Sequence, residues 1–166
     1  GINFTYKPIL LGGLHKLWNI TPQAYIEPKK QFMIMDCEMV SKKFKIDFKF
    51  NSHFPINTIK LMRGCLIFKN DQLTKFIRLV FDAFWKNNED VTSDEVLSKI
   101  LNLIETNLED FNKKTEEIQI KEQLKSLTND AFKKKIFGAP TYFVNKKIFW
   151  GQDRFEYAIE ELNSIS

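Results

Sequence analysis

Paired cysteines are absent from this sequence, whose 166 residues include two cysteines and no Cys-X-X-Cys motif. Cys37 and Cys65 are 28 residues apart, and each lies within an apolar helical pattern. We therefore expect two buried, unbridged thiols rather than a disulfide or a redox pair. The two histidines, His15 and His53, form no cluster with other metal-binding residue types, so no metal site is predicted.

Long hydrophobic runs are also missing. No run approaches the roughly 18 apolar residues that a membrane span requires, although 43% of the residues are hydrophobic. The first residues do not combine a charged segment with an apolar one, as a secretory signal would. The sequence therefore predicts a cytoplasmic protein that has no membrane partner.

Charge of one sign is not concentrated anywhere. The chain has 25 basic and 21 acidic residues, which gives a formal charge of +4. The basic residues are spread along amphipathic helical patterns, and the densest run, at 133–135, is expected at the end of a helix. A nucleic-acid partner is therefore not predicted.

What is present, near the C-terminus, is the pattern of a β-hairpin followed by a helix. Apolar segments at 141–144 and 147–150 flank Asn145 and Lys146, which suit a turn. The apolar residues of the following helix fall on one face: Phe155, Ala158, Ile159 and Leu162. The sequence thus predicts a hairpin that is covered by a C-terminal helix.

Pro140 stands just before this hairpin, and an X-Pro bond is one of the few places where a cis peptide occurs. A cis bond would turn the backbone of Ala139 outward, where it could pair with an extended peptide. Free N–H groups at a helix start near Asp153 would favour a carboxylate. The pattern fits a site for a small acidic peptide, but it also fits an ordinary trans turn with Asp153 as an N-cap.

The rest of the chain is predicted to be mainly helical. Residues 2–11 alternate as a strand, and residues 14–27 are expected to be irregular. Helices are predicted at 29–44, 57–69, 71–86, 93–106, 108–114 and 117–136, the last with Gly138 as its C-cap. Since the sheet elements lie at the two ends, we predict an α/β domain with a helical insertion.

Five segments resemble, in the same order, the 2-hydroxychromene-2-carboxylate isomerase and kappa-class glutathione transferase family. They are residues 6–13 (YKPILLGG), 51–58 (NSHFPINT) with 61–63 (LMR), 87–92 (NNEDVT), 137–141 (FGAPT) and 149–154 (FWGQDR). The resemblance implies a thioredoxin-like sheet of the DsbA type at 1–28 and 129–166, with an all-helical insertion at 29–128. It also implies a homodimer that binds glutathione.

The resemblance further implies which residues hold glutathione. Ala139, followed by Pro140 as the cis residue, would pair its backbone with the cysteinyl part. The Gln152 and Asp153 pair would hold the γ-glutamyl end. Two further residues of the family's site, an Asn in the long loop and a Lys just after a Pro, match Asn19 and Lys30 here.

One part of the family pattern is missing. The family starts with a strand, a Ser-Pro-Tyr type segment and a first helix, and this Ser hydrogen-bonds the glutathione sulfur. No Ser-Pro pair occurs in this sequence, so we assign no catalytic residue within it. We expect the first strand and helix to be absent because the chain is a fragment, with the family Ser in an upstream segment.

Three functions are compatible with this pattern. The resemblance implies a glutathione-dependent isomerase or transferase that acts on an electrophilic, aromatic small molecule. A DsbA-type thiol-disulfide oxidoreductase shares the fold but needs a Cys-X-X-Cys, which this sequence lacks. A non-catalytic thioredoxin-fold module is the third possibility and becomes the leading one if the chain is complete.

Overall fold

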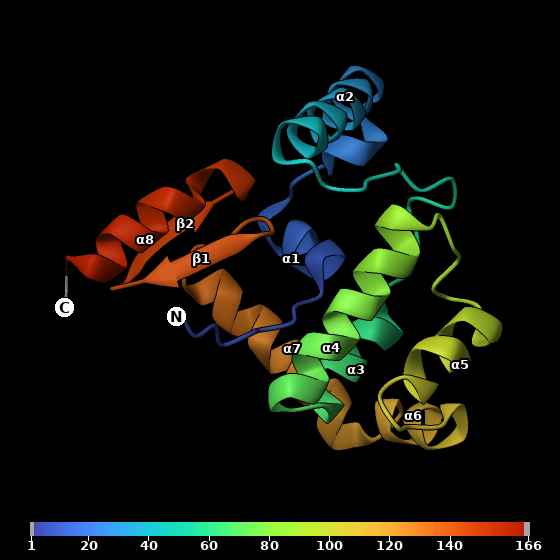
Figure 1. Cartoon of the computed structure of the whole chain (residues 1–166). Coiled ribbons are helices and arrows are strands. Elements are labelled where there is room, and N and C mark those ends of the chain that lie inside the picture. The colour runs from blue at the N-terminus through green and yellow to red at the C-terminus, as the bar shows by residue number, and fades with distance from the viewer. Residues whose placement is uncertain (1, 165–166) are drawn as a thin grey trace.

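The computed structural model describes residues 2–164, which form a mainly helical molecule with one small sheet. The elements are α1 (Leu11–Trp18), the 3-10 turn η1 (Gln23–Tyr25), α2 (Glu27–Phe44), α3 (Ile59–Ile67), α4 (Asn70–Phe81), the π-helical turn η2 (Asp82–Lys86), α5 (Asp94–Asn102), α6 (Leu108–Thr115), α7 (Ile118–Lys133), β1 (Thr141–Val144), β2 (Lys147–Trp150), the 3-10 turn η3 (Gln152–Arg154) and α8 (Phe155–Asn163). Figure 1 shows the hairpin and α8 on one side, α3 to α6 on the other, and α7 extending from the first group to the second.

The predicted hairpin is confirmed. Strands β1 and β2 pair antiparallel, with Val144 opposite Lys147 at the turn. The two turn residues, Asn145 and Lys146, have φ angles of 46° and 63°. Two successive positive φ angles match the right-handed twist of the strands, so a two-residue turn closes this hairpin.

The predicted C-terminal helix is also confirmed and covers one face of the hairpin. Helix α8 contacts both β1 and β2. Ala158 is buried at this contact, and the rings of Tyr142 and Phe155 lie 5.1 Å apart. The one-sided apolar pattern of the sequence therefore fixes how α8 docks.

The main buried cluster lies in the helical part, among residues 61–111. Its largest buried rings are Phe68, Phe76 and Phe111, with centroid distances of 4.9 to 6.1 Å between them. Gly64 of α3 faces these rings, since a Cβ at this position would lie 2.7 Å from Phe111. The whole cluster falls inside the predicted insertion, whose exact boundaries stay a prediction.

The five helices predicted between residues 57 and 136 are confirmed, with ends shifted by a few residues. Ser93 caps α5, because its side chain accepts a hydrogen bond from the Val96 N–H. The prediction that Gly138 is the C-cap of the helix at 117–136 is wrong. Helix α7 ends at Lys133, and Lys135 adopts the left-handed conformation (φ 61°) while the Ile136 N–H donates to the Ala131 carbonyl. A lysine therefore takes the backbone conformation that favours glycine.

The prediction of a strand over residues 2–11 is wrong. Residues 2–10 form no strand, and α1 begins at Leu11 inside the segment that was read as strand and Gly-Gly break. The irregular reading of residues 14–27 is wrong as well, because α1 and η1 lie there. Leu14 is fully buried, and the Leu10 N–H donates to Thr128 Oγ1 of α7 at 2.9 Å. Packing on α7 therefore outweighs the low helix propensity of the two glycines.

Helix α2 has the predicted bounds within two residues, and it contacts η1 but leaves much of its apolar surface exposed. None of its residues is buried, and Phe32 and Phe44 are 58% and 62% exposed. The two cysteines are unbridged, as predicted, yet both are only half-buried. No helix within residues 2–164 is long and apolar enough to cross a membrane.

Candidate functional site

The loop before β1 is held in place by two hydrogen bonds. The Thr141 hydroxyl donates to the Gly138 carbonyl at 2.7 Å, and the Gly151 N–H donates to the Pro140 carbonyl at 3.0 Å. The Ala139–Pro140 peptide bond is cis, and both residues are exposed. The backbone of Ala139 is thus accessible on a loop that is tied to both strands of the hairpin.

Trp150 packs against this loop. A Cβ on Gly138 would lie 2.5 Å from Trp150 Nε1, closer than side-chain atoms pack. The rings of Phe137 and Trp150 lie 5.0 Å apart. Glycine at 138 is therefore required by the close approach of the indole and not by the end of α7.

The other half of the candidate site follows β2. Gly151 has a φ of 107°, a conformation that L side chains rarely adopt, and it turns the chain into η3. Asp153 is exposed and does not cap a helix, since its carboxylate pairs with the Arg154 guanidinium at 2.6 Å. The N-cap alternative for Asp153 is therefore wrong.

The two halves lie next to each other. The hydrogen bond between Gly151 and Pro140 joins the residue before Gln152 directly to the loop that carries Ala139. An exposed backbone edge and an exposed carboxylate at a helix start therefore share one end of the hairpin. The first N–H groups of a helix have no partner within the helix, so this end can also bind an anion.

Helix α2 reaches the same end of the hairpin. The Gln152 side-chain amide donates to the Asp36 carboxylate of α2 at 3.3 Å. Lys30 lies six residues earlier on this helix and is half-buried. At 3.6 residues per turn, its side chain is rotated by roughly 120° from that of Asp36. Its backbone N–H donates to the Ile26 carbonyl at 2.9 Å.

Asn19 follows Trp18, which anchors the end of α1 close to the loop before β1. It ends α1 in the left-handed conformation, with a φ of 55°, and is exposed. Trp18 before it donates its indole N–H to the Ile136 carbonyl at 2.8 Å and packs its ring 4.4 Å from Phe132. The end of α1 is thus anchored three residues before Ala139.

Of the six residues assigned from the sequence, four lie on the two segments that the hydrogen bond between Gly151 and Pro140 joins: Ala139, Pro140, Gln152 and Asp153. Asn19 and Lys30 lie on neighbouring elements without a direct contact to these four. Trp18 and Asp36, which hold those elements in place, were missed. The sequence carries no signal for Asp36, because its contact with Gln152 joins residues 116 apart.

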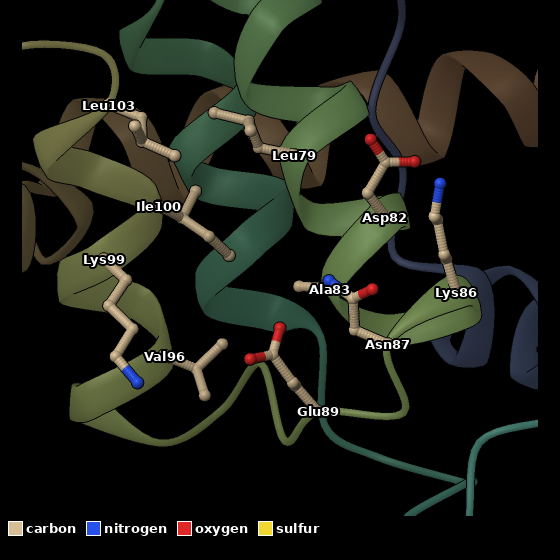
Figure 2. A pocket seen from close by; sticks show the side chains of 10 residues that line it. All are labelled: Leu79, Asp82, Ala83, Lys86, Asn87, Glu89, Val96, Lys99, Ile100 and Leu103. Carbon is tan, nitrogen blue, oxygen red and sulfur yellow. The ribbon is translucent and has the colours of Figure 1, made fainter.

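A separate cavity of about 280 Å³ lies in the helical part, between α4 with η2 and α5. Figure 2 shows its floor of apolar side chains and its charged rim, lined by Leu79, Asp82, Ala83, Lys86, Asn87, Glu89, Val96, Lys99, Ile100 and Leu103. Both lysines are already paired, Lys86 with Asp47 at 2.9 Å and Lys99 with Glu95 at 2.7 Å.

Cys37 lies on α2 and Cys65 on α3, so neither is part of the hairpin loop. Burial raises the pKa of Cys65 to about 11. Burial and the neighbouring Asp36 carboxylate raise the pKa of Cys37 as well. A raised pKa leaves little thiolate at neutral pH, so neither side chain has the activated thiol of a redox enzyme. Within residues 2–164 no three metal-binding side chains come together either.

Residues 1–163 match the DSBA-like thioredoxin domain family, and the chain belongs to this family. Among individual proteins, it is similar to glutathione S-transferase kappa 1 of Rattus norvegicus, with 27% identity over 182 residues. That match covers 93% of this chain and 75% of the rat protein.

The fold is similar to a solved structure of 2-hydroxychromene-2-carboxylate isomerase, with a TM-score of 0.86 and 18% sequence identity. This match covers 97% of the present chain and 80% of the isomerase chain. The DsbA-like thioredoxin fold and the family resemblance predicted from the sequence are thereby confirmed.

Proposed function

We propose that this protein is a glutathione-dependent isomerase or transferase that acts on an electrophilic, aromatic small molecule. The observation that carries the proposal is the hydrogen bond between Gly151 and Pro140, which joins the exposed Ala139 backbone to the Gln152–Asp153 turn. The similarity to a kappa-class glutathione transferase supports the same ligand.

The chemistry of glutathione fits the groups at this end of the hairpin. Glutathione is a short extended peptide with one α-amino group, two carboxylates and a thiol. Ala139 supplies backbone groups for the cysteinyl part by strand addition. Asp153 binds the α-amino group while the N–H groups at the start of η3 take the adjacent carboxylate.

Two residues on neighbouring elements complete the proposed site. Lys30 of α2 binds the glycine carboxylate, and its half-buried stem restricts its motion. Asn19, at the end of α1, hydrogen-bonds the peptide from the other side of the loop. Each of these elements is tied to the hairpin end, α2 through Asp36 and α1 through Trp18.

The proposed reaction starts from the thiolate of glutathione. A free thiol has a pKa of about 8.5, so the site must favour the deprotonated form before the sulfur can attack. The thiolate adds to an electrophilic carbon of the substrate. In an isomerase the adduct rotates about a bond and expels the thiolate again, and in a transferase the adduct is the product.

The same protein is proposed to form a homodimer through α2. This helix exposes three large apolar side chains on one side, Phe32, Met35 and Met39. Contiguous apolar surface of this kind is typical of protein interfaces.

Calorimetry with glutathione tests the proposal on the protein that the complete gene encodes. Asp153→Ala should weaken binding by roughly 10-fold, at the lower end of the range for a charge-assisted hydrogen bond because the carboxylate is exposed. Lys30→Ala should weaken it less. Two variants serve as matched controls: Glu156→Ala removes an exposed negative charge close to Asp153, and Lys29→Ala removes an exposed positive charge next to Lys30. Both should leave the affinity for glutathione unchanged. Equal affinity of the wild type and Asp153→Ala would refute the assignment of Asp153.

A further inference from the structure

A π-helical turn ends α4 and forms one wall of the cavity between α4 and α5. The Asn87 N–H donates to the Asp82 carbonyl, five residues earlier, at 2.9 Å. In an α-helix such a bond spans about four residues, so this turn is wider than the helix that it continues. π-Helical turns are rare and occur frequently at functional sites. The cavity of about 280 Å³ is slightly smaller than typical ligand pockets, which begin at about 300 Å³, so it suits a small molecule.

The floor of this cavity is apolar. Leu79 and Ala83 contribute from the side of α4, and Val96, Ile100 and Leu103 from the side of α5 (Figure 2). Ile100 is buried, whereas Leu103 remains 56% exposed. A ligand with an apolar group would remove this surface from water, which is favourable.

A carboxylate is held at the rim of the cavity by the backbone of its residue. The Glu89 N–H donates to the Ala83 carbonyl at 2.9 Å, and the Glu89 carbonyl accepts from the amide of buried Asn51 at 3.0 Å. Figure 2 shows the Glu89 side chain directed toward the space between α4 and α5. The residue is half-buried, and its carboxylate makes no hydrogen bond or ion pair within residues 2–164. Glu89 therefore presents a fixed negative charge that is available to a ligand.

Each of the two rim lysines is paired with a carboxylate that does not line the cavity. Lys99 bonds to Glu95 at 2.7 Å, and Lys86 bonds to Asp47 at 2.9 Å. The hydrogen bond with Glu95 raises the pKa of Lys99, and the negative charge of Glu89 adds to this effect. The hydrogen bond with Asp47 likewise raises the pKa of Lys86. An anionic ligand would have to compete with both carboxylates for these lysines.

The other charges near the rim are those of Asp82, which lines the cavity, and of Arg78, one turn earlier on α4. Besides Asp47, these two charges act on Lys86 in opposite directions, and the effect of Asp82, which raises its pKa, is the larger. The charges around the cavity therefore balance pairwise except for the carboxylate of Glu89. A site with such an excess of negative charge attracts cations.

We propose that this cavity binds a small organic cation, a primary ammonium group that carries an apolar chain. The ammonium group donates hydrogen bonds to the Glu89 carboxylate and to the side-chain carbonyl of Asn87, which also lines the cavity. The apolar chain lies against Leu79, Ile100 and Leu103, and its contribution to the affinity grows with its length. None of these residues belongs to the hairpin, so the inference is independent of the proposed glutathione site.

The probe is n-hexylammonium chloride, and its binding is measured by the amide chemical shifts of the ¹⁵N-labelled protein that the complete gene encodes. Saturable shifts are expected at Ala83, Glu89 and Ile100. Two probes with a chain of the same length, uncharged 1-hexanol and anionic hexanoate, should each bind at least about 5-fold more weakly. Each CH₂ removed from the alkylammonium chain should weaken binding by up to roughly 4-fold. Hexanol or hexanoate binding as tightly as hexylammonium, or no saturable shift with hexylammonium, would overturn the proposal.

Glu89→Gln provides the matching test, because it removes the charge and keeps the size of the side chain and both backbone hydrogen bonds. It should weaken hexylammonium binding roughly 10-fold and leave hexanol binding unchanged. Glu109→Gln makes the same change of net charge on α6, outside the cavity lining, and should bind hexylammonium as the wild type does. Equal affinity of the wild type and Glu89→Gln would overturn the assignment of Glu89 and the proposal with it. If urea unfolding shows that Glu89→Gln does not fold, the comparison of the three probes on the wild type decides.

Discussion

Gly64→Ala should destabilise the helical part of the protein, because the new Cβ has no room. The Cβ would lie 2.7 Å from two atoms of the Phe111 ring and 3.1 Å from Phe76. Phe111 is fully buried and packs against Phe68 and Phe76, so its ring cannot move without disturbing the cluster. Inserting a methyl group into a packed core typically costs about 1–3 kcal/mol.

Gly12→Ala is the matched control. Gly12 is also within a helix, α1, but a Cβ there has nothing within 4 Å. Both substitutions gain the same helix propensity, about 0.5–1 kcal/mol. The difference between the two variants therefore isolates the packing cost of about 1–3 kcal/mol. Such a difference corresponds to roughly 2–12 °C in Tm for a protein of this size.

Urea unfolding of both variants, followed by circular dichroism, measures this difference. The free energy of unfolding should be higher for Gly12→Ala than for the wild type. It should be lower for Gly64→Ala than for Gly12→Ala, and the m values should be similar. Adding Phe111→Leu to Gly64→Ala should recover part of the loss, since it removes the atoms that the Cβ meets. Equal stabilisation by the two alanines would refute the packing of α3 against α6.

Three other predictions can be measured on the same protein. Asn51→Ala should cost about 1–3 kcal/mol in urea unfolding, because the buried Asn51 amide donates to the Phe84 and Glu89 carbonyls at 2.7 and 3.0 Å; an unchanged midpoint would contradict this. Since the pKa of Cys65 is about 11, only about 0.1% is thiolate at pH 8, so iodoacetamide should label it roughly 200-fold more slowly than free cysteine, and faster as pH rises. Met35→Glu should convert a dimer to a monomer in light scattering, whereas a monomeric wild type would refute the proposed dimer.

The hairpin could be predicted from the sequence because its determinants are local. Asn145 and Lys146 tolerate positive φ, and the flanking apolar segments pair through a two-residue turn. The one-sided pattern of α8 likewise needs only its own residues. For these elements the local preference and the final packing agree.

The N-terminal region could not be predicted in this way, because its structure depends on distant contacts. The alternation at residues 2–11 resembles a strand, but a strand requires a paired neighbour, and within residues 2–164 no strand is hydrogen-bonded to residues 2–9. Gly12 and Gly13 resemble a break, yet Leu14 is buried and Trp18 is anchored to Ile136, 118 residues away. Tertiary contacts determine both outcomes.

The same distinction between local and long-range contacts applies to the candidate site. Ala139 and Pro140 come just before β1, and Gln152 and Asp153 follow β2 after Gly151, so the pairing of the two strands brings all four to the same open end of one hairpin. Asn19 and Lys30 were assigned from the family resemblance, and no spacing rule relates them to the hairpin. The side chains that place their elements, Trp18 and Asp36, act through long-range hydrogen bonds that a sequence pattern does not encode.

Amide chemical shifts recorded during a glutathione titration test the central claim most directly. With the protein that the complete gene encodes, labelled with ¹⁵N, the account predicts saturable shifts at Ala139, Gln152 and Asp153, and smaller shifts at Lys30. Asp153→Ala should need roughly 10-fold more glutathione for the same degree of saturation, whereas Glu156→Ala should leave the titration unchanged. Shifts confined to the cavity between α4 and α5, or no shifts at any concentration, would contradict the proposed glutathione site.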